Sequence, residues 1–454
     1  MGSDRKTSIK NFKVMNISRI SKIHIFFLIL IVIIAFWLRS LNIATVPRHG
    51  ATFDEFAWTW LGINLIQKGM PISWSPHPQY KEREHLRYQG AAFWIVKPYL
   101  EHPPLFGLLA GSFALLNGAK DMYDVTLGNI RPFAVILGIF SIFMIFLLVK
   151  EIYGKEIALF SSLLYATVPT VVIGSRIVQN ENFLIPFWLL SLYLILKYLK
   201  TGRESFRNTA TVIAGLLSLA KIPWLVVGFS LSLILAYKRK LKDSLFVGIV
   251  TALFFSTFIL YGIYFDKGLF LSLWGLQLAR YDISFSGLFS IFTDPLLIDR
   301  RYIDGWIFFG WLSIILLAHD FKKHFLILIP FISYFVLYIF VIPNEPGHGW
   351  YRFPFYPFLL ISLALILKEE LFKPTLRIVL FLFIVGLSLL YNTWQQSFGF
   401  SLFVYRLSII IWSIPILTLI FPSRKINVLS KKIIVISIIL FVILNIFSVN
   451  NFHD

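Results

Sequence analysis

The residues with the clearest capacity for chemistry are Asp54 and Glu55, which stand side by side in RHGATFDEFAWTW, residues 48–60. A carboxylate in an aromatic, apolar segment can accept a proton from a hydroxyl or amine nucleophile. A structural interpretation competes with this one, because TFDE has the form of a capping box. In that box Thr52 would cap a helix and Glu55 would bond back to the Thr52 amide. Both interpretations stay open for Glu55, whereas the box does not require Asp54.

Other acids and bases stand near the ends of apolar runs, where burial near the bilayer centre costs about 2.5–3.5 kcal/mol each. Carboxylates suit proton abstraction, and guanidinium or ammonium groups suit a departing phosphate. Structural alternatives remain for several of them: Glu101 and Glu181 could cap helices, and Arg352 could snorkel within an aromatic belt. The full set of further candidates is Glu101, His102, Arg131, Arg176, Glu181, Lys221, Arg280 and Arg352.

The composition identifies the elements that must position these residues. Of the 454 residues, 57% are hydrophobic and only 14% are charged, whereas soluble domains carry about 25% charged residues. The mean hydropathy is +0.77. We therefore predict an all-α polytopic membrane protein whose first apolar run, IHIFFLILIVIIAFWL, is retained because it lacks a small-residue cleavage site. The absence of cysteine excludes disulfides, thiolate metal sites and a cysteine nucleophile.

The distribution of positive charge predicts membrane lipid, and no nucleic acid, as the partner of the basic residues. The net charge is +19, but lysine and arginine occur in short clusters between apolar runs, the pattern that orients a protein in a bilayer. The clusters fall on one side of the membrane, which predicts a multi-pass protein of the cell membrane with a cytoplasmic N-terminus. They are the N-terminal tail, KEIYGKE, KYLKTGRESFR, KRKLK, FKKH, KEELFKPTLR and PSRKINVLSKK.

A crossing of a hydrocarbon core about 30 Å thick needs about 20 apolar residues, and about thirteen runs approach this length. The predicted spans are 24–41, 131–149, 157–174, 183–199, 209–220, 222–237, 244–265, 303–318, 325–342, 352–367, 376–392, 404–421 and 433–449. A further run, 103–118, would reverse the side of every later basic cluster if it crossed, so we predict that it lies along the outer face.

The remaining segments define the predicted outer face. The first extracytoplasmic loop covers residues 42–130 and carries two surface helices, about 53–67 and 104–117, and a second long loop covers 266–302. No repeat or low-complexity linker divides the chain, so residues 1–454 are expected to form a single transmembrane domain. No Walker A, GxGxxG, HExxH or GxSxG motif occurs, which disfavours nucleotide chemistry and serine hydrolysis.

Several motifs occur in an order and spacing that resemble the GT-C glycosyltransferases. The resemblance is to the group containing the protein O-mannosyltransferases and the lipid A aminoarabinose transferase, and it is clearest over residues 50–225. It weakens through QLARY and WYRFPFYPF. The motifs are FDE, EHPPL, IRPFAVILG, KEIYGKEIALFSSLLYATVP, SRIVQNENFLIPF and LAKIPWL.

The resemblance implies an inverting glycosyltransferase of the cell envelope, with a GT-C-type helical bundle and an extracytoplasmic active site. It would move a hexose, a pentose or an amino sugar from a polyprenyl-phosphate carrier to a lipid, glycan or protein acceptor. By this likeness Asp54 is the catalytic base, Glu55 completes the acidic pair and Glu101 lines the same site. By the same likeness, seven further residues contact the phosphate, the carrier or the sugar. They are His102, Arg131, Arg176, Glu181, Lys221, Arg280 and Arg352.

Two departures from the aminoarabinose transferase concern a metal. His102 stands where that enzyme has lysine after the glutamate, and GLQLARYD lacks the histidine that helps to hold a metal there. The resemblance suggests a divalent cation as a cofactor. Because of these two departures, we assign no metal site and no cofactor from the sequence. We also expect no large soluble domain after the last span, which favours a lipid or glycan acceptor.

Two other classes of protein share some of these features. A transporter or flippase of lipid-linked sugars would use similar cations, but transporters place charges near the midplane on broken helices and have repeated halves. A glycan polymerase or ligase would use outer-loop cations without needing the acidic pair. Indifference of activity to substitution at Asp54 and Glu55 would favour the polymerase or ligase.

Overall fold

The computed structural model describes residues 22–279, 304–340, 349–371, 373–395, 401–421 and 423–452. Most of these residues are helical. The helices are α1 (Lys22–Ser40), α2 (Asp54–Lys68), α3 (Leu105–Leu116), α4 (Leu127–Tyr153), α5 (Lys155–Thr167), α6 (Pro169–Gly174), α7 (Asn180–Thr201), α8 (Glu204–Ser218), α9 (Leu225–Tyr237), α10 (Leu241–Ala279), α12 (Gly305–Ala318), α13 (Phe321–Phe340), α14 (Tyr356–Glu370), α15 (Leu376–Gln395), α16 (Leu402–Ile420) and α17 (Arg424–Asn450). Short 3₁₀ helices are η1 (Met122–Asp124), η2 (Ile222–Trp224) and η3 (Gly349–Phe355).

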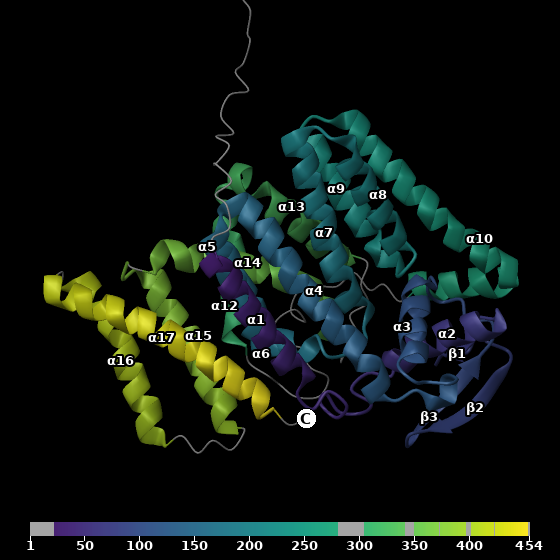
Figure 1. Cartoon of the computed structure of the whole chain (residues 1–454), viewed down its shortest axis with the longest axis horizontal. Helices are drawn as coiled ribbons and strands as arrows, with labels where there is room; N and C mark the ends of the chain where they lie inside the picture. Colours follow the sequence, from purple (N-terminus) through teal and green to yellow (C-terminus); the bar gives the residue numbers. More distant parts are fainter. Residues whose placement is uncertain are drawn as a thin grey trace, which may run out of the picture.

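The helices pack as a bundle around α4, α5 and α7 (Figure 1). Helices α8, α9 and α10 pack together on one side of it, and α15, α16 and α17 on another (Figure 1). Every predicted span coincides with helical residues where the structure describes it. Within the described ranges, eight helices are long and apolar enough to cross a membrane.

Large apolar side chains cover the outside of the bundle. On α10, Ile249, Leu253 and Leu260 are 59%, 61% and 66% exposed. Contiguous apolar surface of this kind is costly in water and favourable in hydrocarbon, and a helix satisfies its own backbone polar groups there. The chain is a multi-pass membrane protein, as the composition predicted.

The segment between α1 and α4 contains the two predicted surface helices, α2 and α3, and also a small sheet that the sequence analysis missed. Its strands are β1 (Ser73–Trp74), β2 (Arg83–Tyr88) and β3 (Ala91–Val96), paired antiparallel in the order β1-β3-β2. Gln89 and Gly90 join β2 to β3 with φ values of 47° and 84°. This two-residue turn with positive φ at both positions matches the twist of a hairpin. The helical expectation for the chain is confirmed, with this sheet as an addition.

Two predicted elements are interrupted for local reasons. The span 157–174 divides into α5 and α6 at Val168, because a residue before proline is disfavoured in the helical region. Helix α10 is broken at Asp266, whose φ of −165° and ψ of 100° are not helical and whose Oδ1 accepts a bond from the Leu269 amide. Residues 267–279 of the predicted second outer loop are therefore helical, and residues 280–302 lie outside the described ranges.

Candidate active site

Close contact between α2 and α3 brings two candidate acids, Asp54 and Glu101, to the same end of the bundle. A Cβ on Gly62 would lie 1.8 Å from the carbonyl oxygen of Gly107, and one on Gly111 would lie 2.5 Å from the Ile63 amide nitrogen. The two backbones therefore touch. A higher residue number in α2 contacts a higher residue number in α3, so the two helices run in the same direction. Asp54 at the start of α2 and Glu101 before α3 consequently stand at the same end.

The Asp54 carboxylate is held by an amide that the sequence analysis did not single out. Nε2 of Gln179 donates to Asp54 Oδ2 at 3.1 Å and to Thr52 Oγ1 at 2.9 Å. Oε1 of the same side chain accepts from Trp58 Nε1 at 3.3 Å, which fixes the orientation of the amide. Gln179 is fully buried, whereas Asp54 is partly exposed. One carboxylate oxygen is thus fixed, and Oδ1 makes no hydrogen bond with any residue that the structure describes.

Glu55 points into the protein, and the capping-box interpretation is wrong. Helix α2 begins at Asp54 without a side-chain cap, and Thr52 Oγ1 accepts from the Asp54 amide instead. The Glu55 carboxylate accepts from Arg131 Nε at 3.1 Å and Arg131 Nη2 at 2.9 Å, and also from the Val178 amide at 2.9 Å. Both side chains are almost fully buried. A bidentate, charge-assisted pair of this kind is stronger than a cap to a neutral amide.

Two of the predicted arginines direct their donors to the protein itself. Nη1 of Arg131 donates to the carbonyls of Ile43 and Pro47 at 2.9 and 2.6 Å. Nη2 of Arg176 donates to the carbonyl of Leu38 at 2.7 Å. Burial, together with the positive charges of Arg39 and Arg131, lowers the pKa of Arg176 to about 10, so this side chain stays charged at neutral pH. These arginines fix the segment that follows α1.

Glu181 and Lys221 form a second buried ion pair. Lys221 Nζ lies 2.7 Å from Glu181 Oε1, and the side chains are 6% and 0% exposed. Nζ also lies 4.5 Å from the centre of the Tyr351 ring. Burial acts to lower the pKa of Lys221, but the nearby charges of Glu181, Tyr351 and Asp54 outweigh it and raise that pKa. The Asn180 side chain at the start of α7 is not a helix cap, because it donates to the Ala220 carbonyl and accepts from Trp224 Nε1.

Glu101 lies among aromatic and histidine side chains. Its Oε2 is 3.5 Å from Nε2 of His77, which precedes β2, and the side chain is 6% exposed. Burial, then the charge of Glu101, raises the pKa of both Tyr80 and Tyr99, and Asp54 contributes at Tyr99. The charges of Asp54 and Glu101 therefore both act on the Tyr99 hydroxyl. The His102 ring lies 5.0 Å from that of Trp58, between centres.

The last two candidates come from the second half of the chain. Arg352 is 3% exposed in η3, directly after the Tyr351 that contacts Lys221. Tyr334 donates a hydrogen bond to the Tyr351 carbonyl at 2.7 Å, which holds η3 against α13. Arg280 lies outside the described residues. The structure thus gathers Asp54, Glu101, Glu181 and Lys221 at one end of the bundle, with Arg352 one residue from Tyr351.

Several residues of this site are not predicted from the sequence, namely His77, Tyr80, Tyr99, Gln179 and Tyr351. Only Gln179 carried a signal, since it lies between two candidate charges in SRIVQNENFL. Within the described residues, no group of three or more histidine, aspartate or glutamate side chains could hold a metal ion.

Comparison with known proteins agrees with this architecture. Residues 101–262 match the family model described as dolichyl-phosphate-mannose-protein mannosyltransferase. That segment contains Glu101, Arg131, Gln179, Glu181 and Lys221 of the site, and Asp54 lies before it. A search of curated protein sequences finds no match.

Two solved structures share the fold. One is the archaeal oligosaccharyltransferase AglB from Archaeoglobus fulgidus, in complex with an inhibitory peptide and a dolichol-phosphate, at 15% identity and a TM-score of 0.51. The match covers 90% of this chain but 56% of AglB, so the chain spans little more than half the length of that protein. The other is ArnT from Cupriavidus metallidurans bound to undecaprenyl phosphate, at 15% identity and a TM-score of 0.55, covering 94% of this chain and 77% of ArnT.

These matches show the fold of the protein. It has the GT-C fold of AglB and ArnT, built in a multi-pass membrane protein. The resemblance to the polyprenyl-phosphate-sugar glycosyltransferases is confirmed, by the family model over residues 101–262 and by the fold over most of the chain.

Proposed function

We propose that the protein is an inverting glycosyltransferase that moves a sugar from a polyprenyl-phosphate carrier to an acceptor on the extracytoplasmic side of the membrane. The observation that carries the proposal is the Asp54 carboxylate, with one oxygen fixed by Gln179 and the other without a partner among the described residues. A base that must take a proton from an incoming nucleophile needs this combination of fixed orientation and free acceptor capacity.

The proposed reaction is a single displacement. The acceptor hydroxyl attacks the anomeric carbon as Asp54 accepts its proton, and the bond from that carbon to the carrier phosphate breaks. The phosphate leaves with the electron pair of that bond and remains on the polyprenyl chain. Because attack and departure occur on opposite faces of the sugar, the anomeric configuration inverts. A phosphate leaving group needs cations more than it needs an acid.

Lys221 is the proposed cation nearest to this chemistry. Its raised pKa keeps the ammonium group charged, and the Asp54 carboxylate is among the groups that raise it. Glu181 holds the ammonium group in place at 2.7 Å. Arg352 and Arg280 are proposed to extend the positive charge toward the carrier phosphate.

The other site residues receive supporting roles in the proposal. Glu101 and His102 would orient sugar hydroxyls, since a carboxylate among aromatic rings suits both hydroxyl hydrogen bonds and packing of the apolar sugar face. Glu55, Arg131 and Arg176 would stabilise the backbone around the site, because their bonds go to one another or to backbone carbonyls and amides. The family match and the shared fold support these assignments, with Asp54 outside the matched segment.

The test is transfer of radiolabel from a panel of polyprenyl-phosphate sugars in membranes containing wild-type protein, Asp54→Asn or Glu82→Gln. Glu82 is a matched control because it is a carboxylate of the same loop and is 77% exposed. The proposal expects label to enter an acceptor with wild type and Glu82→Gln, and Asp54→Asn to lose at least about 1,000-fold in rate. Equal transfer by all three proteins would refute the base assignment, and movement of intact donor across the membrane would indicate a flippase.

A further inference from the structure

The first turns of α17 carry a cluster of four cations, Arg424, Lys425, Lys431 and Lys432, here called the α17 basic patch. Arg424, Lys425 and Lys432 are exposed and Lys431 is half-buried. The patch is remote from the site in sequence and belongs to a helix that the proposed reaction does not use. It is therefore a separate feature of the molecule.

The charge of the α17 basic patch is not neutralised within the described chain. None of its four side chains has a carboxylate partner among the residues that the structure describes. Other cations at interhelical loops do have partners: Lys197 and Lys200 contact Glu151, and Arg377 contacts Glu370. An uncompensated group of like charges repels itself, so its natural complement is an anion.

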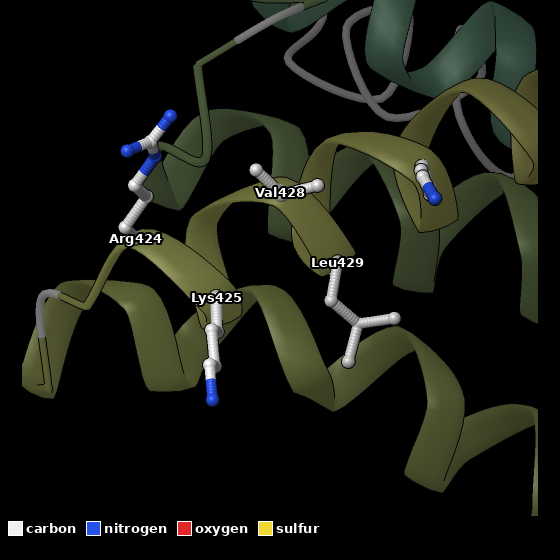
Figure 2. Close-up of a pocket in the computed structure, with 5 residues that line it drawn as sticks. Arg424, Lys425, Val428 and Leu429 are labelled. Atoms are coloured by element: carbon white, nitrogen blue, oxygen red, sulfur yellow. The ribbon is translucent and has the colours of Figure 1, made fainter.

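A shallow, largely open hollow on the surface of α17 coincides with the patch. It has a volume of about 360 Å³ and is lined by Arg424, Lys425, Val428, Leu429 and Lys432. Figure 2 shows Lys425 and Leu429 projecting the same way from the helix, with Arg424 at its start. A second hollow of about 290 Å³ adjoins it, lined by Lys431, Lys432, Val435 and Ile436. Cations and apolar side chains thus alternate along this part of the helix.

The length of the patch along the helix is comparable with the thickness of the headgroup layer of a bilayer. From Lys425 to Lys432 the helix rises about 10 Å at 1.5 Å per residue, similar to the headgroup layer of about 5–8 Å on each side. Apolar residues within the patch and after it are also exposed, with Leu429 at 48% and Ile436 at 63%. The opposite side of the helix is buried in the bundle, where Asn445 Oδ1 accepts from Trp306 Nε1 at 2.8 Å. The exposed side therefore presents cations next to exposed apolar side chains.

We infer that the α17 basic patch binds an anionic phospholipid, with its phosphodiester between Arg424, Lys425 and Lys432 and an acyl chain along Leu429 and Ile436. The two parts of the ligand correspond to the two parts of the surface. Arginine and lysine bind phosphate oxygens, and Leu429 and Ile436 bury an acyl chain that a free phosphate lacks. This site is independent of the proposed transfer reaction.

The test is native mass spectrometry of the full-length protein in detergent with added phosphatidylglycerol or phosphatidylcholine of identical acyl chains. We expect wild type to retain phosphatidylglycerol at least tenfold better than phosphatidylcholine. The variant Arg424→Gln/Lys425→Gln/Lys432→Gln should lose this preference, and Lys432→Gln alone should lose about fivefold. The single variant provides the test if the triple variant does not fold. Leu429→Ser should weaken retention of both lipids.

The control removes the same charge elsewhere in the variant Lys155→Gln/Lys242→Gln/Lys322→Gln, whose cations also have no carboxylate partner among the described residues. It should keep the wild-type preference. An equal loss in both triple variants would overturn the inference, because it would show attraction by net charge alone. Displacement of phosphatidylglycerol by millimolar inorganic phosphate would also overturn it, because the site would then take the anion without the acyl chain.

Discussion

Gln179 and Asp54 are joined by a hydrogen bond of 3.1 Å between Nε2 and Oδ2, although 125 positions separate them in the chain. The same amide also bonds Thr52 and Trp58, so its direction is determined from two sides. The proposed base is therefore oriented by a residue from the turn before α7. This relationship makes Gln179 a positioning residue for Asp54.

Replacing Gln179 by methionine should slow transfer by about 10- to 100-fold with little change in KM for the donor. The methionine has a similar volume but cannot donate to the carboxylate, so Asp54 loses its orientation and retains its charge. The measurement is steady-state kinetics together with a pH profile of kcat/KM. A structural role alone would lower the amount of folded protein and leave kcat per folded molecule unchanged, and that result would contradict the positioning role.

Breaking the pair between Glu55 and Arg131 should cost stability. The variant Arg131→Met leaves the Glu55 carboxylate buried without its cation, which costs about 3–5 kcal/mol. The free energy of unfolding, measured by denaturant titration in detergent, should fall by this amount. The matched control is Lys97→Gln, which breaks a pair that is 62% and 77% exposed at 4.0 Å, and exposed pairs contribute less than about 1 kcal/mol. Equal effects of both variants would show that the Glu55 pair carries no special weight.

The ammonium group of Lys221 should remain charged throughout the working pH range. Since the nearby carboxylates raise its pKa above the ordinary value, the stabilisation from its ion pair is fully present below the unfolded pKa and disappears only as pH rises through the folded pKa. We expect wild type and Lys221→Arg to have the same shape of kcat/KM between pH 6 and about 9. Lys221→Met should lose at least about 100-fold at every pH in this range. An alkaline limb below about pH 9 that occurs in wild type and disappears in Lys221→Arg would contradict the raised pKa.

The glycine contact between α2 and α3 should tolerate no side chain. In Gly62→Ala the new Cβ would lie 1.8 Å from the Gly107 carbonyl oxygen, so the helices must separate at a cost of at least about 1–3 kcal/mol. Activity should fall as well, because the separation moves Asp54 away from Glu101. Gly275→Ala is the matched helical control, since nothing lies within 4 Å of its new Cβ, and it should be neutral or stabilising by up to about 1 kcal/mol. Thermal unfolding of both variants checks the prediction, and equal midpoints would disprove the close contact.

The absence of cysteine allows a direct test of topology. Single cysteines can be introduced as Glu82→Cys in the first loop and Lys242→Cys at the start of α10, and both positions are exposed. In intact cells a membrane-impermeant maleimide should label Glu82→Cys, and Lys242→Cys should react only after permeabilisation. Labelling in the reverse order would place the site on the cytoplasmic side and remove the basis for a lipid-linked donor.

The sequence by itself determined the class of the protein and much of its outline. Runs of apolar residues predicted every helical span that the structure describes, because a chain in hydrocarbon must satisfy its backbone within each segment. The run 103–118 forms a separate helix, α3, and its place on the outer face stays a prediction. The hairpin of β2 and β3 was missed, although its Gln89–Gly90 turn was present in the letters, because a short sheet carries a weak periodic signal.

Only the tertiary structure decided how the charges are paired. Glu55 and Arg131 are 76 positions apart, and Glu181 and Lys221 are 40 apart, so no local pattern could connect them. The local capping motif suggested a partner for Glu55 that the fold does not use. The reason is energetic: a buried carboxylate such as that of Glu55 or Glu181 requires a cation or hydrogen-bond donors, whereas a helix cap can be replaced by backbone geometry. The sequence therefore identifies the candidate acids, and the fold decides which partner each of them has.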